Sequence, residues 1–284
     1  MVKNKDLPMA TSQIRFDGSG HWYSKDGASR HDADLRIARK ECLYPSVTSI
    51  DSAVFTNEFL QKWKMNQLVI AASENPRQPH QNAQQYAQHI YDLSMEKSRT
   101  AIEFGKELHD AMEKYPEPPA NSLLVPWFEK FGVWWSGKKI EPVSRECTLL
   151  DHDLGIAGRT DLIGKIADLR FVADWKTQDV KMDDKGRKKP AFYDSWPRQL
   201  AFYAGCDAKA TGQWPNLPTC ISLIIDSNPD GGLYEKVWSN DEILDAYHTF
   251  VTGAWLWFDK RGYWPSGPWK PTFDRPMPVI ERQL

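Results

Sequence analysis

The chain has 284 residues, of which 41% are hydrophobic and 26% are charged, a balance typical of a globular protein with a sizeable core. The net charge of −2 excludes the overall basic field of a general nucleic-acid binder, so any basic footprint has to be local. The sequence lacks a run of about 18 apolar residues and a secretory signal, so we expect a cytoplasmic protein without a membrane partner.

The N-terminal part of the chain predicts a hairpin followed by helices. Residues 12–27 alternate apolar and polar side chains around glycine-containing turns, which indicates a small hairpin. Ser46 or Thr48 can cap a helix whose apolar positions extend from Ile50 to Trp63. The polar, glutamine-rich segment 74–90 is typical of an exposed connection that leads into another helix.

The remainder of the chain has the pattern of an α/β core. An amphipathic helix is expected over 98–115, and a three-stranded meander over 143–150, 155–163 and 169–176. The later expected elements are a helix over 197–210, strands over 220–226 and 233–238, and a helix over 241–258. This order predicts a mixed β-sheet flanked by helices. We therefore divide the chain into an N-terminal hairpin and helical lobe (1–97), packed on a core (98–284) that ends in a Pro-rich surface tail after Trp264.

Two aspartates and a lysine interrupt the last two strands of the meander. Strand alternation places Asp174 and Lys176 on one face, and a hairpin turn centred on residues 167–168 would put Asp161 opposite Asp174. Like charges so placed repel each other, and a cation between them removes the penalty. A longer loop would shift the register and send the two aspartates to opposite faces. The alternative interpretation is a surface strand with scattered charges.

The residues after Asp174 add positive charge and a hydroxyl. Lys176 can hold a water or hydroxide and offset charge on a phosphate, although a solvated ion pair with Asp174 is the simpler interpretation. Thr177 could donate a hydrogen bond to a phosphate oxygen.

Five short motifs, in this order and spacing, resemble the RecB-like branch of the PD-(D/E)XK nuclease superfamily. They are residues 44–50, Gly105-x-x-x-His109, Gly158-x-x-Asp161, Asp174-x-Lys176 and Gln199-x-x-x-Tyr203. The segment 44–50 is similar to one in phage and mitochondrial genome-maintenance exonucleases. The resemblance implies a restriction-endonuclease-like core with an N-terminal helical lobe.

The resemblance also implies a set of site residues. The metal ligands would be His109, Asp161, Asp174 and the backbone carbonyl of Trp175, with Lys176 acting in catalysis. Gln199 and Tyr203 would contact the substrate, although an i, i+4 pair ordinarily marks helix packing. Two carboxylates suit Mg²⁺, and a histidine ligand makes Mn²⁺ an alternative. Glu146 could orient a ligand or water, but we leave it outside the expected site.

A basic segment follows the candidate catalytic strand. Residues 181–198 include Lys188 and Lys189, which could contact a nucleic-acid backbone, although acidic residues among them are also typical of a solvated loop. Tyr193 or Trp196 could stack on an unpaired base.

The leading hypothesis is a metal-dependent DNA exonuclease of replication, repair or recombination in a bacterial or phage setting. Its partners would be DNA, single- or double-stranded, and a recombination or replication protein. A noncatalytic DNA-binding or assembly module with the nuclease fold is the alternative. A carbohydrate enzyme, suggested by the 13 tryptophans, leaves Lys176 without a role.

Overall fold

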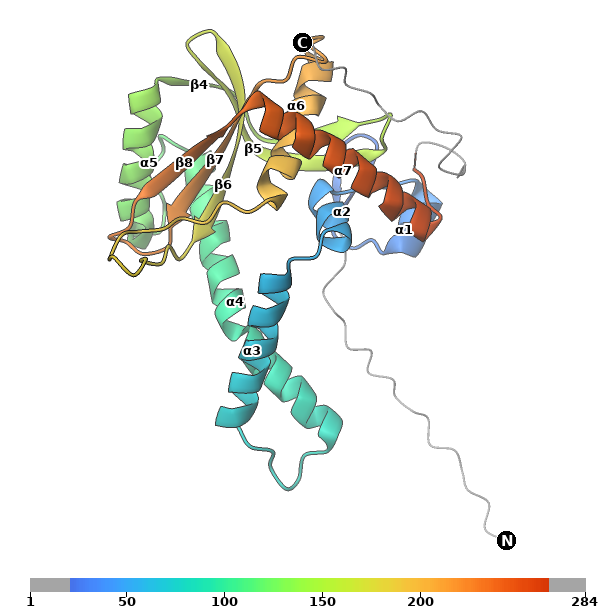
Figure 1. Cartoon of the computed structure of the whole chain (residues 1–284), viewed down its shortest axis with the longest axis vertical. Coiled ribbons are helices and arrows are strands. Elements are labelled where there is room, and N and C mark those ends of the chain that lie inside the picture. Colours follow the sequence, from blue (N-terminus) through green and yellow to red (C-terminus); the bar gives the residue numbers. More distant parts are fainter. Residues whose placement is uncertain (1–20, 266–284) are drawn as a thin grey trace.

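A five-stranded mixed sheet forms the centre of the molecule, and a computed structural model describes residues 21–265 (Figure 1). Its strands are β4 (Ile140–Asp151), β5 (Ile156–Ile166), β6 (Leu169–Gln178), β7 (Thr219–Asp226) and β8 (Leu233–Trp238). The strand order is β4-β5-β6-β7-β8, with β6 and β7 parallel and all other neighbours antiparallel. The expected meander and the mixed sheet are confirmed.

Helices cover both faces of the sheet (Figure 1). Helix α6 (Ser195–Ala210) contacts one face, and α7 (Asn240–Arg261) packs against α6. The other face is covered by the C-terminal part of α4 (Ala83–Glu113) and by α5 (Val125–Lys138), after the short 3₁₀ helix η1 (Ser122–Leu124). Alternation along β6 divides the core accordingly: Val172 joins the cluster under α6, whereas Ala173 and Trp175 join the cluster under α4 and α5.

The N-terminal segment forms a small sheet and two short helices beside β5. The elements are β1 (Trp22–Tyr23), β2 (Ser29–Arg30), α1 (Leu35–Glu41), β3 (Tyr44–Pro45) and α2 (Val47–Val54). Strand β1 pairs with β2, which confirms a hairpin there, while residues 12–20 of the expected hairpin lie outside the described residues. Ser46 caps α2, because its Oγ accepts a hydrogen bond from the Ser49 N–H at 3.0 Å.

Three expectations about the helices are wrong. The single helix expected over 50–63 is broken after Val54, and α3 (Glu58–Glu74) begins anew behind an Asn57 cap. The expected connection leads into a helix, but it is shorter than expected: α4 begins at Ala83 rather than near residue 98, because glutamine is a good helix former and Asn82 with Gln85 forms a capping box. Helix α5 was not expected, because its aromatic residues obscure the helical period.

Helix α3 and the first half of α4 form a helical hairpin that projects from the body (Figure 1). The division expected between residues 97 and 98 falls inside α4. Ala71 is the buried residue of α3, and large apolar side chains of that helix are exposed, namely Phe59, Leu60, Trp63, Met65, Val69 and Ile70. Within residues 21–265, helices of sufficient length are too polar to cross a bilayer. The expected surface tail after Trp264 lies almost wholly outside the described residues.

The packing of α6 on α7 depends on Gly205. A Cβ at this position would lie 2.8 Å from Cε2 of Tyr247. Gly205→Ala should lower the free energy of unfolding by about 1 kcal/mol or more, because overpacking costs about 1–3 kcal/mol and helix propensity returns less than about 1 kcal/mol. Urea unfolding measures the change. Gly137→Ala in α5 is the matched control: its Cβ would meet no atom within 4 Å, so the free energy of unfolding should rise slightly.

Candidate active site

The register of β5 and β6 brings the two predicted aspartates together. Leu162 pairs with Ala173 and Ile166 with Leu169, so Asp161 and Asp174 are the next residues beyond the ladder. The predicted register is confirmed. The two-residue turn is possible because Ala167 adopts a φ of 52°, in the left-handed region that tight hairpin turns use.

The two strands separate just beyond Leu162, and side chains replace the ladder hydrogen bonds. The Trp175 N–H donates to Oδ2 of Asp161 at 2.6 Å, and Oγ1 of Thr160 donates to the carbonyl of Ala173 at 3.1 Å. Asp161 is therefore fixed between the strands by its own carboxylate. Trp175 contributes its N–H to this arrangement, and a metal contact through its carbonyl remains a prediction.

Glu146 is the third carboxylate at this level of the sheet, and the sequence analysis left it out. Strand β4 pairs Arg145 with Leu162 and Cys147 with Thr160, so Glu146 stands opposite Asp161. One ligand atom each from His109, Glu146 and Asp161 lie within 4.8 Å of one another. The turn after Asp151, which pairs with Ile156, could have revealed this alignment from the sequence.

His109 reaches the cluster from α4, where its Nδ1 lies 3.4 Å from Oδ1 of Asp161. Asp174 does not belong to that group of potential ligands and forms an ion pair with Lys176 instead. The structure thus brings the expected residues His109, Asp161, Asp174 and Lys176 together. It places Glu146, rather than Asp174, beside His109 and Asp161.

Helix α6 holds the other side of Asp174. Gln199 Nε2 donates to Oδ1 of Asp174 at 3.3 Å and to the Tyr203 hydroxyl at 2.8 Å, while Gln199 Oε1 accepts from Lys176 Nζ at 3.2 Å. Gly158 makes room for this helix, since a Cβ there would lie 2.5 Å from Cε1 of Tyr203. Gln199 and Tyr203 therefore adjoin the acidic cluster, where the resemblance places them, and their contact with a substrate remains a prediction.

The carboxylates lie close together and are largely shielded from water, which raises the pKa values of two of them. Burial, opposed by the charge of Lys176, raises the pKa of Asp174 to about 6. Burial and the nearby charge of Asp161 raise the pKa of Glu146 to about 7, although Arg159 lies 2.6 Å from its carboxylate. Negative charge at this end of the sheet is thus incompletely compensated by the protein.

Against the effect of burial, the neighbouring carboxylates raise the pKa of His109 and of Lys176 above their ordinary values. Burial alone would raise the pKa of Asp161, but the hydrogen bond and charge of His109 keep it below its ordinary value. Burial would lower the pKa of Lys176, but Asp174 and Asp161 raise it above its ordinary value. Lys176 is therefore an ammonium group at neutral pH, and its contacts with Asp174 and Gln199 fix its position.

Thr177 is not on the side of the sheet where phosphate contact was expected. Alternation turns it away from Lys176 toward α4, where a Cβ on Gly105 would lie 3.5 Å from the Thr177 Oγ1. That oxygen is buried and has no hydrogen-bond partner among the described residues. A Cβ at Gly105 would make only ordinary van der Waals contact with Thr177, so the packing of α4 on β6 does not require a glycine there.

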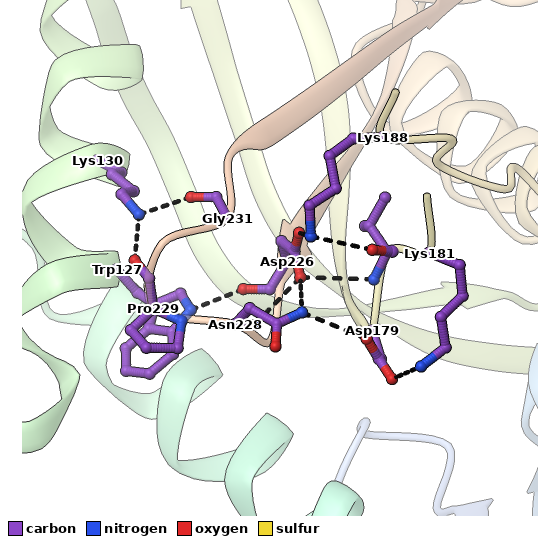
Figure 2. A network of polar contacts seen from close by, with 10 residues as sticks. Trp127, Lys130, Asp179, Lys181, Lys188, Asp226, Asn228, Pro229 and Gly231 are labelled. Atoms are coloured by element: carbon purple, nitrogen blue, oxygen red, sulfur yellow. Dashed lines mark hydrogen bonds and ion pairs between the residues drawn. The ribbon is translucent and has the colours of Figure 1, made fainter. Parts of the chain in front are cut away.

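Lys188 takes part in an internal network (Figure 2). Its Nζ lies 2.9 Å from Oδ2 of Asp226, whose side chain is fully buried, and donates to the carbonyl of Val180 at 3.1 Å. Asp226 also accepts from the backbone and side-chain amides of Asn228, at 3.1 Å and 2.9 Å. Lys188 therefore links the basic segment 181–198 to the C-terminal ends of β6 and β7. Lys189 is exposed, and its contact with DNA remains a prediction.

No protein-family model matches the chain, and no curated protein matches its sequence. A functional proposal for this chain therefore rests on the geometry and chemistry of the acidic cluster.

The network around Asp226 gives a test of the role of Lys188. Asp226→Ala leaves Lys188, which is partly exposed, and the Asn228 amides without their acceptor, so the free energy of unfolding should fall by about 1–3 kcal/mol. Lys189→Ala, at the exposed neighbouring position, should change it by less than about 0.5 kcal/mol. Chemical unfolding of both variants measures this, and equal stabilities would show that the network is not structural.

Proposed function

We propose that this chain is a divalent-metal-dependent DNA nuclease, acting as an exonuclease in replication, repair or recombination. The observation that carries the proposal is the convergence of three carboxylates from neighbouring strands with His109 and Lys176 where β5 and β6 separate. The proposed catalytic residues are Asp161, Asp174 and Lys176. The ordered sequence motifs and the mixed sheet support a PD-(D/E)XK core as part of this proposal.

The donor set fits a hard divalent cation. His109, Glu146 and Asp161 offer one imidazole nitrogen and carboxylate oxygens within 4.8 Å of one another, which suits Mg²⁺ or Mn²⁺. The raised pKa of Glu146, caused by burial and by Asp161, indicates negative charge that a cation would stabilise. Such a cation, when bound, lowers the pKa of a coordinated water and stabilises charge on a scissile phosphate.

The protein's own residues would position the other reactants. Lys176 presents a fixed ammonium group that can orient a nucleophilic water by hydrogen bonding and offset charge on the phosphate. Asp174 and Gln199 hold that ammonium in place, and Tyr203 in turn orients Gln199. Hydrolysis of a glycosidic bond uses two carboxylates and would not require a lysine fixed in this way.

Removal of the Lys176 ammonium tests the catalytic proposal. Purified protein should degrade end-labelled DNA with Mg²⁺ or Mn²⁺ and not with EDTA, and Lys176→Ala should lower the rate by about 10²–10³-fold. Lys165→Ala, an exposed lysine at the far end of β5, is the control and should keep the wild-type rate. DNA binding without turnover in the wild-type protein would instead indicate a noncatalytic module.

A second test concerns the proposed ligands. Calorimetric titration of the DNA-free protein with Mn²⁺ should show affinity at least about 10-fold weaker in Glu146→Gln and His109→Ala, since loss of even an outer partner of a metal site costs this much. Glu141→Gln, an exposed glutamate on the same strand, should bind Mn²⁺ as the wild-type protein does. Unchanged affinity in Glu146→Gln would remove Glu146 from the proposed ligand set.

A further inference from the structure

A cleft of about 350 Å³ opens beside the acidic cluster. It lies between the β1–β2 hairpin, the start of α2, and strands β4 and β5. Glu146 of the acidic cluster lines this cleft, and so does Gln199, which donates to Asp174, so the cleft and the candidate active site are continuous. The proposed chemistry assigns no ligand to it.

The walls of the cleft carry cationic or hydrogen-bonding side chains. Arg159 lies 2.6 Å from Glu146, and its side chain is 51% exposed. The rings of His21 and His31 meet edge to face at 5.2 Å, and both residues are exposed. Ser29 Oγ lies 2.9 Å from Nε2 of His31. Glu146 is the sole carboxylate among the lining residues and is paired with Arg159, and burial and the neighbouring His31 lower the pKa of His21. The cleft therefore offers an anion mainly N–H and O–H donors.

We propose that this cleft binds a terminal phosphate of a DNA strand, an inference that rests on the proposed nuclease function. A terminal phosphate carries about −1.5 to −2 charges, more than a backbone phosphodiester, and suits a site with a guanidinium and two imidazoles. A volume of about 350 Å³ is near the lower end for ligand sites, which suits the end of one strand better than a duplex.

Arg159 connects the two sites. In this structure its guanidinium faces Glu146, and a guanidinium has five N–H donors, more than one carboxylate uses. The phosphate therefore meets donors on two sides: Arg159 from β5, and His21 and His31 from the N-terminal hairpin. A strand end held there lies next to the acidic cluster, which would select phosphorylated ends for digestion.

The test measures binding without turnover. Single-stranded oligonucleotides with a 5′-phosphate, a 3′-phosphate or hydroxyls at both ends are titrated in EDTA, with fluorescence anisotropy as the readout. One phosphorylated end should bind about tenfold more tightly than the hydroxyl ends, as expected for charge-assisted hydrogen bonds. The preferred end identifies which terminal phosphate the cleft takes. Equal affinity for all three would overturn the proposal.

Two variants test whether the preference for a phosphorylated end depends on residues of the cleft. Arg159→Gln and His31→Ala should each reduce the tenfold difference to less than about threefold and leave the affinity for hydroxyl-ended DNA almost unchanged. Both positions are exposed, so the folded state should persist, which thermal melting verifies. Arg36→Gln, an exposed arginine on α1 outside the cleft, is the charge-matched control and should keep the preference. A preference that survives both cleft variants would overturn the proposal.

Failure of this inference can be separated from failure of the proposed function. Metal-dependent cleavage without any end preference would support the nuclease proposal and overturn the proposal that the cleft binds a terminal phosphate. An Arg159-dependent end preference without cleavage would support terminal-phosphate binding in the cleft and overturn the nuclease proposal. Absence of DNA binding in every arm would overturn both.

Discussion

The rest of the candidate site depends on one electrostatic constraint, the alignment of three carboxylates on three neighbouring strands. Glu146, Asp161 and Asp174 occupy one level of the sheet, where side chains of like charge repel. Each has a positive or polar partner: Arg159 lies beside Glu146, His109 beside Asp161, and Lys176 beside Asp174. Burial raises the pKa of Glu146 and of Asp174 despite those partners, which is why we propose a further cation beside them.

The helices act mainly by bringing these partners into reach. Helix α4 places Gly105 over Thr177 of β6, and the same helix face carries His109 one turn later, beside Asp161. Helix α6 fits over β5 because Gly158 leaves space for Tyr203, which holds Gln199 against Asp174. Gly158, which a sequence motif marks only as a small residue, is therefore a position of close approach between the sheet and α6.

Local rules of strand geometry predicted the centre of the site but not its edges. The Asp161–Asp174 register followed from alternation and a two-residue turn, both of which are readable within 20 residues. Glu146 was missed because aligning it needs the register of a third strand, which is set by the turn between Asp151 and Ile156. Lys188 looked like a surface cation because its acceptor, Asp226, lies on another strand. Contacts between segments distant in sequence decide such assignments.

The cationic side chains beside the three carboxylates differ in how firmly they are held in place. Lys176 is held by both Asp174 and Gln199, and its side chain is 26% exposed, so its ammonium is a fixed part of the site. Arg159 has a side chain that is 51% exposed and lies at the border of the cleft. A divalent cation shared by Glu146 and Asp161 would weaken the hold of Glu146 on this guanidinium. Under the proposed function, cation binding would thereby release Arg159 toward a strand-end phosphate, and the affinities for the two ligands would be coupled.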